Sequence, residues 1–368
     1  MALDFLKNKK PQIGLDISPN GITAVSMQRK SNKMILRNIG YESFDKELIQ
    51  NGIITNPEIF TNTLIRLLEN NGFTERTVNV SVPSTITFIK TITLPDLPIN
   101  ELKLIAPQEA SKHIPFSLDE VNIDFQILEN TRRQDNSGKK VDIVLVAVSK
   151  AIVEGYLENI YNAELNIAAI DVAPFAMIRT ITNAGLINDP NSLYISVLIG
   201  HENTDINVIC EGMPLFTNNA PIGKKNVIDS LVNSLGVDPE TLEKMLPELA
   251  LVIPGMNIDD LDPQKSKAAA TVRTVYNNIS SEIQKTIEFF HSQNAQTKEI
   301  KKIIIGGTGV CLQNIDKYIA NRLKIDTILC DSLGNIVHTI DYSDNLIYPT
   351  NIPALATSVG LALKGLVD

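Results

Sequence analysis

The stretch Gln12-Ile-Gly-Leu-Asp-Ile-Ser-Pro-Asn-Gly-Ile-Thr-Ala-Val-Ser-Met27 decides the fold of this chain. It contains two apolar runs on either side of the cluster Ser18-Pro-Asn-Gly21, whose residue types favour turns and readily reach positive φ. Two apolar runs around such a turn predict an antiparallel hairpin. A third apolar run, from Met34 to Ile39, follows a short polar gap and predicts another strand of the same sheet. The fold therefore opens with three antiparallel strands.

The order of the three opening strands, Ile13 to Ile39, occurs a second time later in the chain. Apolar residues at near-helical spacing predict a helix from Pro57 to Leu68, and Val78-Asn-Val-Ser-Val82 predicts a strand that ends at Pro83. From Leu193 the strand order begins again, with apolar runs at 193–199, 205–210 and 213–217. Because the order repeats while the residues hardly do, we predict an α/β fold of two similar halves. The second half continues with expected helices at 225–235, 266–294 and 310–323, strands at 302–305 and 327–330, and a last helix at 353–366.

A block within the first half has a different pattern. Strands are expected at 87–94, 121–128 and 141–148, with a helix at 100–113 that Pro107 should kink or divide. The wholly polar stretch 131–140 predicts a solvated loop. The block is interpreted as an inserted α+β subdomain. The expected ranges are 1–85 for the first half, 86–163 for the insertion, 164–190 for the return to the first half, 191–350 for the second half, and 351–368 for a C-terminal helix that packs back on the first half.

Composition excludes several classes of protein. The 368 residues carry 33 Lys and Arg against 42 Asp and Glu, a formal net charge of −9, whereas proteins that bind nucleic acid neutralise phosphates with basic patches. The three cysteines are widely spaced without a CxxC pair, which argues against a disulfide framework or a zinc site and fits a reducing cytoplasm. No apolar stretch is long enough to span a bilayer, so we expect membrane contact only through a partner.

Three turns carry the candidate binding residues. The first turn follows a strand end and offers backbone donors that would form an anion-binding nest, the second repeats this arrangement in the other half, and the third is a glycine turn between a buried strand and a helix. Each also has an ordinary interpretation, as a hairpin corner or as a tight connection. The residues are Asp16, Ile17, Ser18, Asn20 and Gly21, then Gly200, His201, Asn203 and Thr204, then Gly306, Gly307 and Thr308.

The order of these segments resembles the PilM family of type IV pilus assembly proteins. The quoted segments are Gly14-Leu-Asp-Ile17, Gln108-Glu-Ala-Ser-Lys-His-Ile-Pro-Phe-Ser-Leu-Asp-Glu-Val121, Asp171-Val-Ala-Pro-Phe-Ala176, Ser281-Glu-Ile-Gln-Lys-Thr-Ile-Glu-Phe-Phe290 and Gly306-Gly-Thr-Gly309. The resemblance implies an actin-like ATPase fold, in which two RNase H-like halves surround a nucleotide cleft. The block 86–163 would be the subdomain called 1C in FtsA-like proteins, inserted into subdomain 1A.

The resemblance also implies a site for ATP and Mg²⁺. The first two turns would be phosphate loops with Asp16 near the metal, and Gly306 to Thr308 would face the adenosine. Glu282 and Lys285 would lie near ribose and base, with a solvated helix face as the alternative. The family usually has Asp where Leu198 stands, glycine where Ser18 stands and often lysine where Thr23 stands. These departures argue against ATP hydrolysis and weaken the neutralisation of phosphate charge. They leave two possibilities open, a cleft that binds ATP weakly and a cleft that binds no nucleotide.

By the same resemblance the chain would be a cytoplasmic adaptor at the inner face of the inner membrane. It would bind the N-terminal cytoplasmic peptide of PilN in a groove between subdomains 1A and 1C and link it to the pilus motor. The expected groove residues are Val82, Pro83, Ile114, Pro115 and Phe116. The alternative for Ile114 and Phe116 is that they seal the core of the insertion.

Two other functions remain open. A working ATPase or small-molecule kinase of the same superfamily would need a carboxylate near the second phosphate loop, and Glu202 and Asp205 are the candidates. A membrane-binding division protein like FtsA would need a basic amphipathic helix after the segment Gly365 to Asp368, which directly follows the last expected core helix. We rank this last function below the others.

Overall fold

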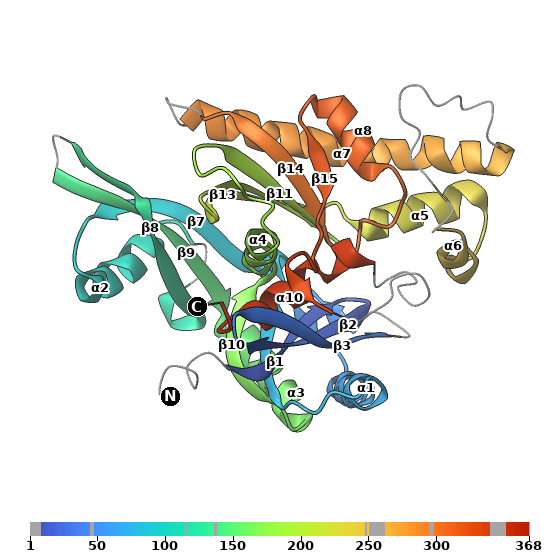
Figure 1. The fold of residues 1–368 in the computed structure, drawn as a ribbon, viewed down its shortest axis with the longest axis horizontal. Coiled ribbons are helices and arrows are strands. Elements are labelled where there is room, and N and C mark those ends of the chain that lie inside the picture. Colours follow the sequence, from blue (N-terminus) through green and yellow to red (C-terminus); the bar gives the residue numbers. More distant parts are fainter. Residues whose placement is uncertain are drawn as a thin grey trace.

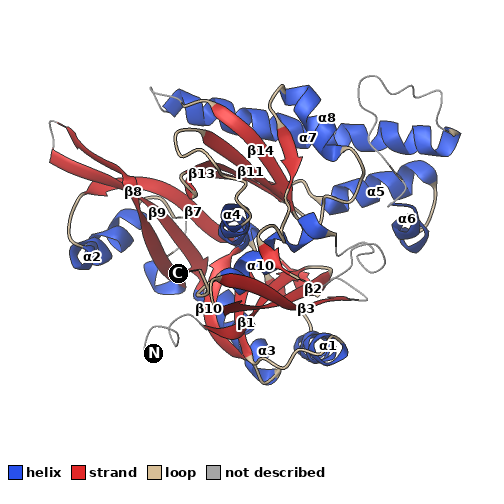
Figure 2. Cartoon of the chain, viewed as in Figure 1, coloured by secondary structure: helices blue, strands red, loops and turns tan. Residues whose placement is uncertain are grey.

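The computed structural model describes residues 9–44, 48–114, 117–135, 138–246, 249, 262–293, 298–338 and 351–367. Two sheets face each other across a central layer of helices, and a third, smaller sheet projects to one side (Figure 1). Figure 2 shows the same arrangement by element type. Among the described helices, none is both long enough and apolar enough to cross a membrane.

The first sheet contains the three strands expected at the start of the chain. Its strands are β1 (Lys9–Ser18), β2 (Gly21–Lys30), β3 (Lys33–Ser43), β6 (Thr77–Val82), β10 (Asn166–Val172) and β16 (Ile336–Val337), in the order β10-β6-β1-β2-β3-β16. β1 to β3 are antiparallel, while β6 runs parallel to β1 and β10 runs parallel to β6. The predicted hairpin, third strand and following strand are confirmed.

Alternation along β1 determines which helices cover each face of this sheet. Ile13 and Leu15 point to one face, where α1 (Pro57–Asn70) and α3 (Lys150–Asn162) bury their apolar sides against them. On the other face, α10 (Ala356–Leu363) follows the short helix η6 (Ile352–Leu355). It packs so closely that a Cβ at Gly14 would overlap the carbonyl oxygen of Ser358. The glycine in β1 is therefore a packing requirement of the C-terminal helix.

The second sheet repeats the topology of the first. Its strands are β11 (Leu193–Ile199), β12 (Thr204–Cys210), β13 (Met213–Ala220), β14 (Ile300–Gly306) and β15 (Thr327–Leu329), in the order β13-β12-β11-β14-β15. In both sheets the first strand is central, the next two follow as a meander on one side, and parallel strands lie on the other. The predicted duplication is confirmed. A small hairpin, β4 (Ile49–Gln50) and β5 (Ile53–Ile54), lies outside both sheets.

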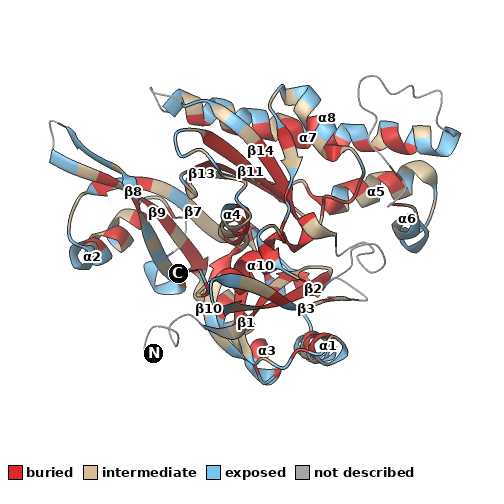
Figure 3. Cartoon of the chain, in the orientation of Figure 1, coloured by how far each residue is buried: buried red, intermediate tan, exposed pale blue. Residues whose placement is uncertain are grey.

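Helices cover both faces of the second sheet. α5 (Lys224–Leu235), α7 (Pro263–Gln293) and α8 (Ile315–Leu323) bury one face, and α6 (Pro239–Met245) packs near α5. The other face packs on α4 (Ala173–Asn183), which also contacts α10, so α4 and α10 form the layer between the two sheets. The inner strands and these two helices form the continuous buried region in Figure 3.

The chain returns to the first sheet before the C-terminal helix. β16 pairs in parallel with β3, with Ile336 opposite Met34, although residue 336 falls in the range expected for the second half. Residues 339–350 of that range lie outside the described residues. Similarly, α3 falls within the expected insertion but packs its Tyr156 and Ile160 in the core of the first sheet. The division into five ranges stays a prediction.

The inserted block is a three-stranded antiparallel sheet with one helix. After the turn η2 (Ser84–Ile86), it comprises β7 (Thr87–Pro95), α2 (Ile99–Ala110), the turn η3 (Leu118–Glu120), β8 (Val121–Asp135) and β9 (Gly138–Ser149), with strand order β7-β9-β8. One side of the sheet and α2 share a core that includes Leu102, Ala106 and Leu145. The block therefore has an apolar core of its own.

Two expectations for individual elements were wrong. The polar stretch 131–140 is not an open loop, because β8 and β9 continue as a hairpin to the pair Asp135 and Gly138. Ion pairs such as Lys140–Asp135, at 2.7 Å, satisfy the polar side chains across the strands. α2 continues past Pro107 and is therefore not divided there, and the alternative of a kink stays a prediction. α8 begins at Ile315, not at residue 310, because a turn precedes it.

Candidate functional site

The first candidate loop is a tight hairpin turn. β1 ends at Ser18 and β2 begins at Gly21, and the Ser18 hydroxyl donates to the side chain of Asn20 at 2.8 Å and to the Gly21 carbonyl at 2.9 Å. None of the four residues has a positive φ, contrary to what the turn cluster favoured. The glycine is needed for space, since a Cβ at Gly21 would lie 2.6 Å from the Glu42 carbonyl oxygen.

Asp16 lies near the end of β1, beside this turn. Burial raises the pKa of its carboxyl group to about 6, and the hydrogen bond from the Ser81 hydroxyl, at 3.4 Å, opposes that rise. A carboxylate whose charge is poorly solvated gains from a nearby cation. The role near a metal that the resemblance implied for Asp16 stays a prediction.

The second candidate loop is held by the start of α5. The backbone amide of Gly200 donates to Asn203 O at 2.8 Å, and the Thr204 hydroxyl donates to Ile222 O at 2.6 Å. The amides of Lys224 and Lys225 donate to the carbonyls of Gly200 and His201 at 2.9 and 2.8 Å. The first amides of α5 thus serve the loop and are not available to a ligand.

The glycine turn after β14 packs directly against the second loop. Gly307 has φ 99°, and a Cβ on it would overlap the carbonyl oxygen of Ile199, which precedes Gly200. The Gly309 amide donates to the same carbonyl at 2.8 Å. Thr308 is half-buried. The fold therefore brings together two of the three turns that the sequence singled out, and glycine is required where their backbones meet.

Glu282 and Lys285 lie farther along α7. Another α7 residue reaches the glycine turn: the Tyr276 hydroxyl donates to Gly309 O at 2.9 Å. Glu282 follows six residues later, about 9 Å along the helix axis. It forms an ion pair with Lys285 at 2.7 Å, and the Lys285 side chain is 69% exposed. Lys285 thus lies on a solvated helix face, and the approach of either residue to a ribose stays a prediction.

A buried polar cluster joins the two halves. The Ser84 hydroxyl of the first half donates to Asp205 Oδ2 at 2.9 Å, and Asn219 of β13 donates to Asp205 Oδ1 at 2.7 Å. The amide groups of Asn203 and Asn219 also donate to Ser84 Oγ, at 2.8 and 3.2 Å. We call these four side chains the Ser84 junction. Our sequence analysis missed Ser84 and Asn219, although polar residues beside apolar strands are a signal for buried networks.

Asp205 is the carboxylate at the centre of this junction. It is 3% exposed, and burial raises its pKa to about 6 against the hydrogen bonds from Asn219, Ser84 and Asn203. In the β11–β12 ladder it lies directly opposite Leu198, the position where an aspartate was expected. Glu202, the other candidate, is 41% exposed and approaches Lys225 at 3.7 Å.

Each half contributes one carboxylate near the candidate loops, and among the described residues no three His, Cys, Asp or Glu side chains cluster as a metal site would. Asp16 and Asp205 supply carboxylate oxygens, the ligands that Mg²⁺ prefers, from the two halves of the molecule. Both accept hydrogen bonds from the segment 81–84, whose ends are at most about 10 Å apart. The amides of Gly200 and Gly309 already donate to protein carbonyls, so these two donors are not available to a bound polyphosphate.

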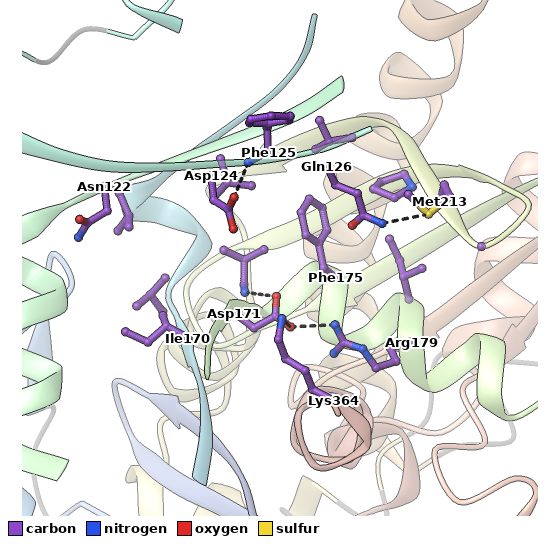
Figure 4. Close-up of a pocket in the computed structure, with 18 of the residues that line it drawn as sticks. Asn122, Asp124, Phe125, Gln126, Ile170, Asp171, Phe175, Arg179, Met213 and Lys364 are labelled. Carbon is purple, nitrogen blue, oxygen red and sulfur yellow. Dashed lines mark hydrogen bonds and ion pairs between the residues drawn. The ribbon is translucent and has the colours of Figure 1, made fainter. Parts of the chain in front are cut away.

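The structure shows a large cavity elsewhere, between the inserted block and the first half (Figure 4). Its volume is about 870 Å³, and β8, β9, β10, α4 and the β12–β13 turn line it. Apolar walls come from Val82, Val146, Val148, Ile170 and Phe175. We call this cavity the groove. Because the turn at Gly212 to Pro214 belongs to the second half, three parts of the molecule border the groove.

A charged cluster lies on the first-half side of the groove. Asp171 of β10 is 9% exposed and accepts from Arg179 at 2.9 Å and from Lys364 at 3.0 Å, both on Oδ2. Figure 4 shows the three side chains converging. Two cations on one carboxylate leave a net positive charge here, while Asp124 of β8 brings a second carboxylate to the groove, so the groove offers charged groups of both signs to a polar ligand.

The five residues expected to form a groove have different locations. Val82 lines the cavity, and Pro83 is half-buried beside it. Ile114 packs in the core of the inserted block, as its alternative interpretation proposed. Pro115 and Phe116 lie outside the described residues. The sequence analysis did not assign β8, β9 or Asp171 to the groove, because their approach depends on how the insertion sits against the first half.

Two halves of one topology, a pair of loops at the ends of their first strands and an inserted block define an actin-like protein. The family profile described as "Type IV pilus assembly protein PilM" matches residues 14–366. This chain belongs to that family, which confirms the resemblance read from the sequence.

Solved structures agree on the fold. A chain of a PilM–PilN type IV pilus biogenesis complex superposes with a TM-score of 0.80 at 20% identity, covering 96% of this chain and 98% of that one. The ethanolamine utilization protein EutJ from Carboxydothermus hydrogenoformans superposes with a TM-score of 0.54 at 13% identity, covering 96% of this chain and 90% of that one. MreB 5 of Spiroplasma citri bound to AMPPNP gives 0.50 at 12% identity, covering 89% and 94%.

Proposed function

We propose that this protein is an adaptor of the type IV pilus assembly platform, and that the groove binds the N-terminal cytoplasmic peptide of PilN. The groove itself is the observation that carries the proposal. It combines apolar walls with a charged cluster at Asp171, the composition expected of a specific binding site. The family and the PilM–PilN complex among the similar structures support this choice of partner.

The groove suits an extended peptide. In the order β7-β9-β8, β8 is an edge strand, and an edge strand offers unpaired backbone groups to a further strand. Its residues Asn122 to Gln126 line the groove and would run alongside about 15 Å of peptide. Apolar peptide side chains would then contact Val146 and Phe175, while a polar one would reach the cluster at Asp171.

Calorimetric titration with a synthetic PilN N-terminal peptide tests the proposal. Val146 is half-buried in the groove wall, and Val146→Glu should weaken binding at least tenfold because the peptide would cover an unpaired charge. Val337→Glu is the control, since Val337 is 45% exposed on β16 and does not line the groove. Equal affinity of the two variants would refute the groove as the binding site.

The proposal includes binding of ATP with Mg²⁺ at the loops between the halves. MreB 5, whose structure was solved with AMPPNP, has a similar fold, and Asp16 and Asp205 would supply one metal ligand from each half. The bound metal would neutralise phosphate charge, and the chain would orient it through these carboxylates. Asp16→Asn should reduce binding of a fluorescent ATP analogue at least fivefold in the presence of Mg²⁺. Unchanged affinity would remove Asp16 from the site.

The second candidate function is slow ATP hydrolysis or phosphoryl transfer. One observation favours it: Asp205 lies across the ladder from Leu198 and so supplies a carboxylate beside the position where one is missing. A carboxylate there would orient the attacking water or hydroxyl group. Release of phosphate from ATP that Asp205→Asn abolishes would favour an enzyme. Release no faster than in buffer would refute the enzyme and leave the adaptor as the one proposed function.

The adaptor would act at the cytoplasmic face of the inner membrane, held there by PilN, and would link PilN to the pilus motor. The family supports this place, since its members are type IV pilus assembly proteins. Cell fractionation tests it. The protein should sediment with membranes when PilN is present and stay in the supernatant when PilN lacks its N-terminal peptide.

A further inference from the structure

A four-residue segment connects the nucleotide loops with the groove. Ser81 at the end of β6 donates to Asp16, and Ser84 donates to Asp205. Between them, Val82 is 1% exposed and lines the groove. The segment therefore contacts a candidate metal ligand of each half through its serines, and contacts the proposed peptide site through its valine.

The hydrogen bonds of Ser84 are fully used. Its hydroxyl donates once, to Asp205, and accepts twice, from Asn203 and Asn219. All three partners belong to the second half, and Ser84 itself is 8% exposed. A buried polar group that loses a partner costs free energy, so a change at one member of the Ser84 junction is transmitted to the others.

One member of the junction also belongs to the second candidate loop. Asn203 lies between Gly200 and Thr204, and its amide reaches Ser84 Oγ at 2.8 Å but Asp205 Oδ2 only at 3.5 Å. A polyphosphate at this loop would compete with Ser84 for that amide. A metal on Asp205 would likewise compete with the Ser84 hydroxyl for the carboxylate. Ligand binding would therefore rearrange the contacts of Ser84.

The groove would respond because the second half borders it. The Gln126 side chain of β8 contacts the sulfur of Met213 at 3.7 Å, across the groove mouth. A shift of the second half relative to segment 81–84 would therefore change the distance between the groove walls.

We propose that the Ser84 junction couples the nucleotide loops to the groove, so that nucleotide bound between the halves changes the affinity for the peptide. This inference rests on the proposed function, because it concerns regulation of the same groove. Coupling is reciprocal, so the peptide would change nucleotide affinity by the same factor. Ser84 acts as a positioning residue, since it touches neither ligand and works through Asp205, Asn203 and Val82.

The test is calorimetric titration of the full chain with the PilN peptide, with and without Mg²⁺-AMPPNP, which avoids turnover. In the wild type the two dissociation constants should differ at least fivefold, the lower end of typical allosteric coupling. Ser84→Ala should reduce the ratio below twofold while peptide binding stays measurable. Asn219→Ala removes a donor of the Ser84 junction that lies outside the loop, and it should reduce the ratio in the same way. It serves as a second variant if Ser84→Ala folds poorly.

Thr91→Val is the matched control. It removes a hydroxyl that also joins the insertion to the second half, but away from the nucleotide loops. It should keep the wild-type ratio, and a loss as large as in Ser84→Ala would show general loosening and overturn the junction. If the two dissociation constants are equal in the wild type, or if Ser84→Ala keeps the wild-type ratio, the coupling is refuted, but the groove remains the proposed peptide site. Absence of peptide binding in both conditions overturns the proposed function together with the coupling.

Discussion

The close packing of α10 predicts that Gly360→Ala will disrupt the centre of the molecule. A Cβ at Gly360 would overlap the carbonyl oxygen of Ala176 on α4, so the two helices must separate. Overpacking of this kind lowers the unfolding free energy by about 1–3 kcal/mol. Separation also weakens two hydrogen bonds between the helices, from Thr180 to Ala356 O at 2.6 Å and from Arg179 to Gly360 O at 2.8 Å. These would add about 1 kcal/mol each.

Helix propensity opposes this loss, because alanine is more favourable than glycine in a helix interior by about 1 kcal/mol. The net expected loss of unfolding free energy is therefore about 2–4 kcal/mol, measured by urea denaturation. Gly155→Ala is the matched control. Gly155 lies inside α3, and no described neighbour beyond its own stretch of helix comes within 4 Å of where a Cβ would stand. The unfolding free energy of Gly155→Ala should be higher than that of the wild type by up to about 1 kcal/mol.

The same variant should affect the groove. The chain after α10 carries Lys364, whose ammonium group contacts Asp171 at 3.0 Å, so a displaced helix would disturb the charged wall. We expect peptide affinity to fall at least threefold in Gly360→Ala and to stay unchanged in Gly155→Ala. If both variants were equally stable, the close contact between α4 and α10 would be refuted.

Three further predictions concern charged groups. Asp171→Ala leaves Arg179 and Lys364 without their shared carboxylate, so urea denaturation should show a loss of about 1–3 kcal/mol; an unchanged midpoint would contradict this. In the folded state the pKa values of Asp16 and Asp205 are raised from 3.8 to about 6, so the folded state binds their protons more tightly than the unfolded chain does. As the pH rises from 4 to 7, the unfolding free energy therefore falls by up to about 3 kcal/mol for each of the two groups. Relative to the wild type, Asp16→Asn should therefore gain stability over that interval in denaturation at several pH values, and a constant difference would refute the raised pKa. Binding of Mg²⁺-AMPPNP at pH 6 should release protons from both carboxyl groups, which calorimetry in buffers of different ionisation enthalpy detects; zero release would argue against metal ligation.

Much of the fold could be predicted because its signals are local. Apolar runs around the turn at Ser18 to Gly21 identified the hairpin, and helical spacing identified α1. The prediction failed at 131–140, where polar residues pair across two strands and so satisfy each other without apolar alternation.

The candidate site was predicted only in its loops. Strand ends and glycines are visible in the sequence, and the fold does bring Gly307 to Ile199 beside the second loop. The sequence also suggested Asp205, but it did not suggest its partner Ser84, which lies 121 positions away. Lys364 and Asp171, the charged wall of the groove, are 193 positions apart.

The sequence by itself determined the strands, the helices, the duplicated order and the family of this protein, since each depends on patterns within short segments or on their order. Only the tertiary structure decided which polar side chains meet at the Ser84 junction and which walls enclose the groove. The physical reason is range. A hydrogen bond acts over about 3 Å, so a pair exists only after packing has placed two distant segments side by side, and no local pattern encodes that placement.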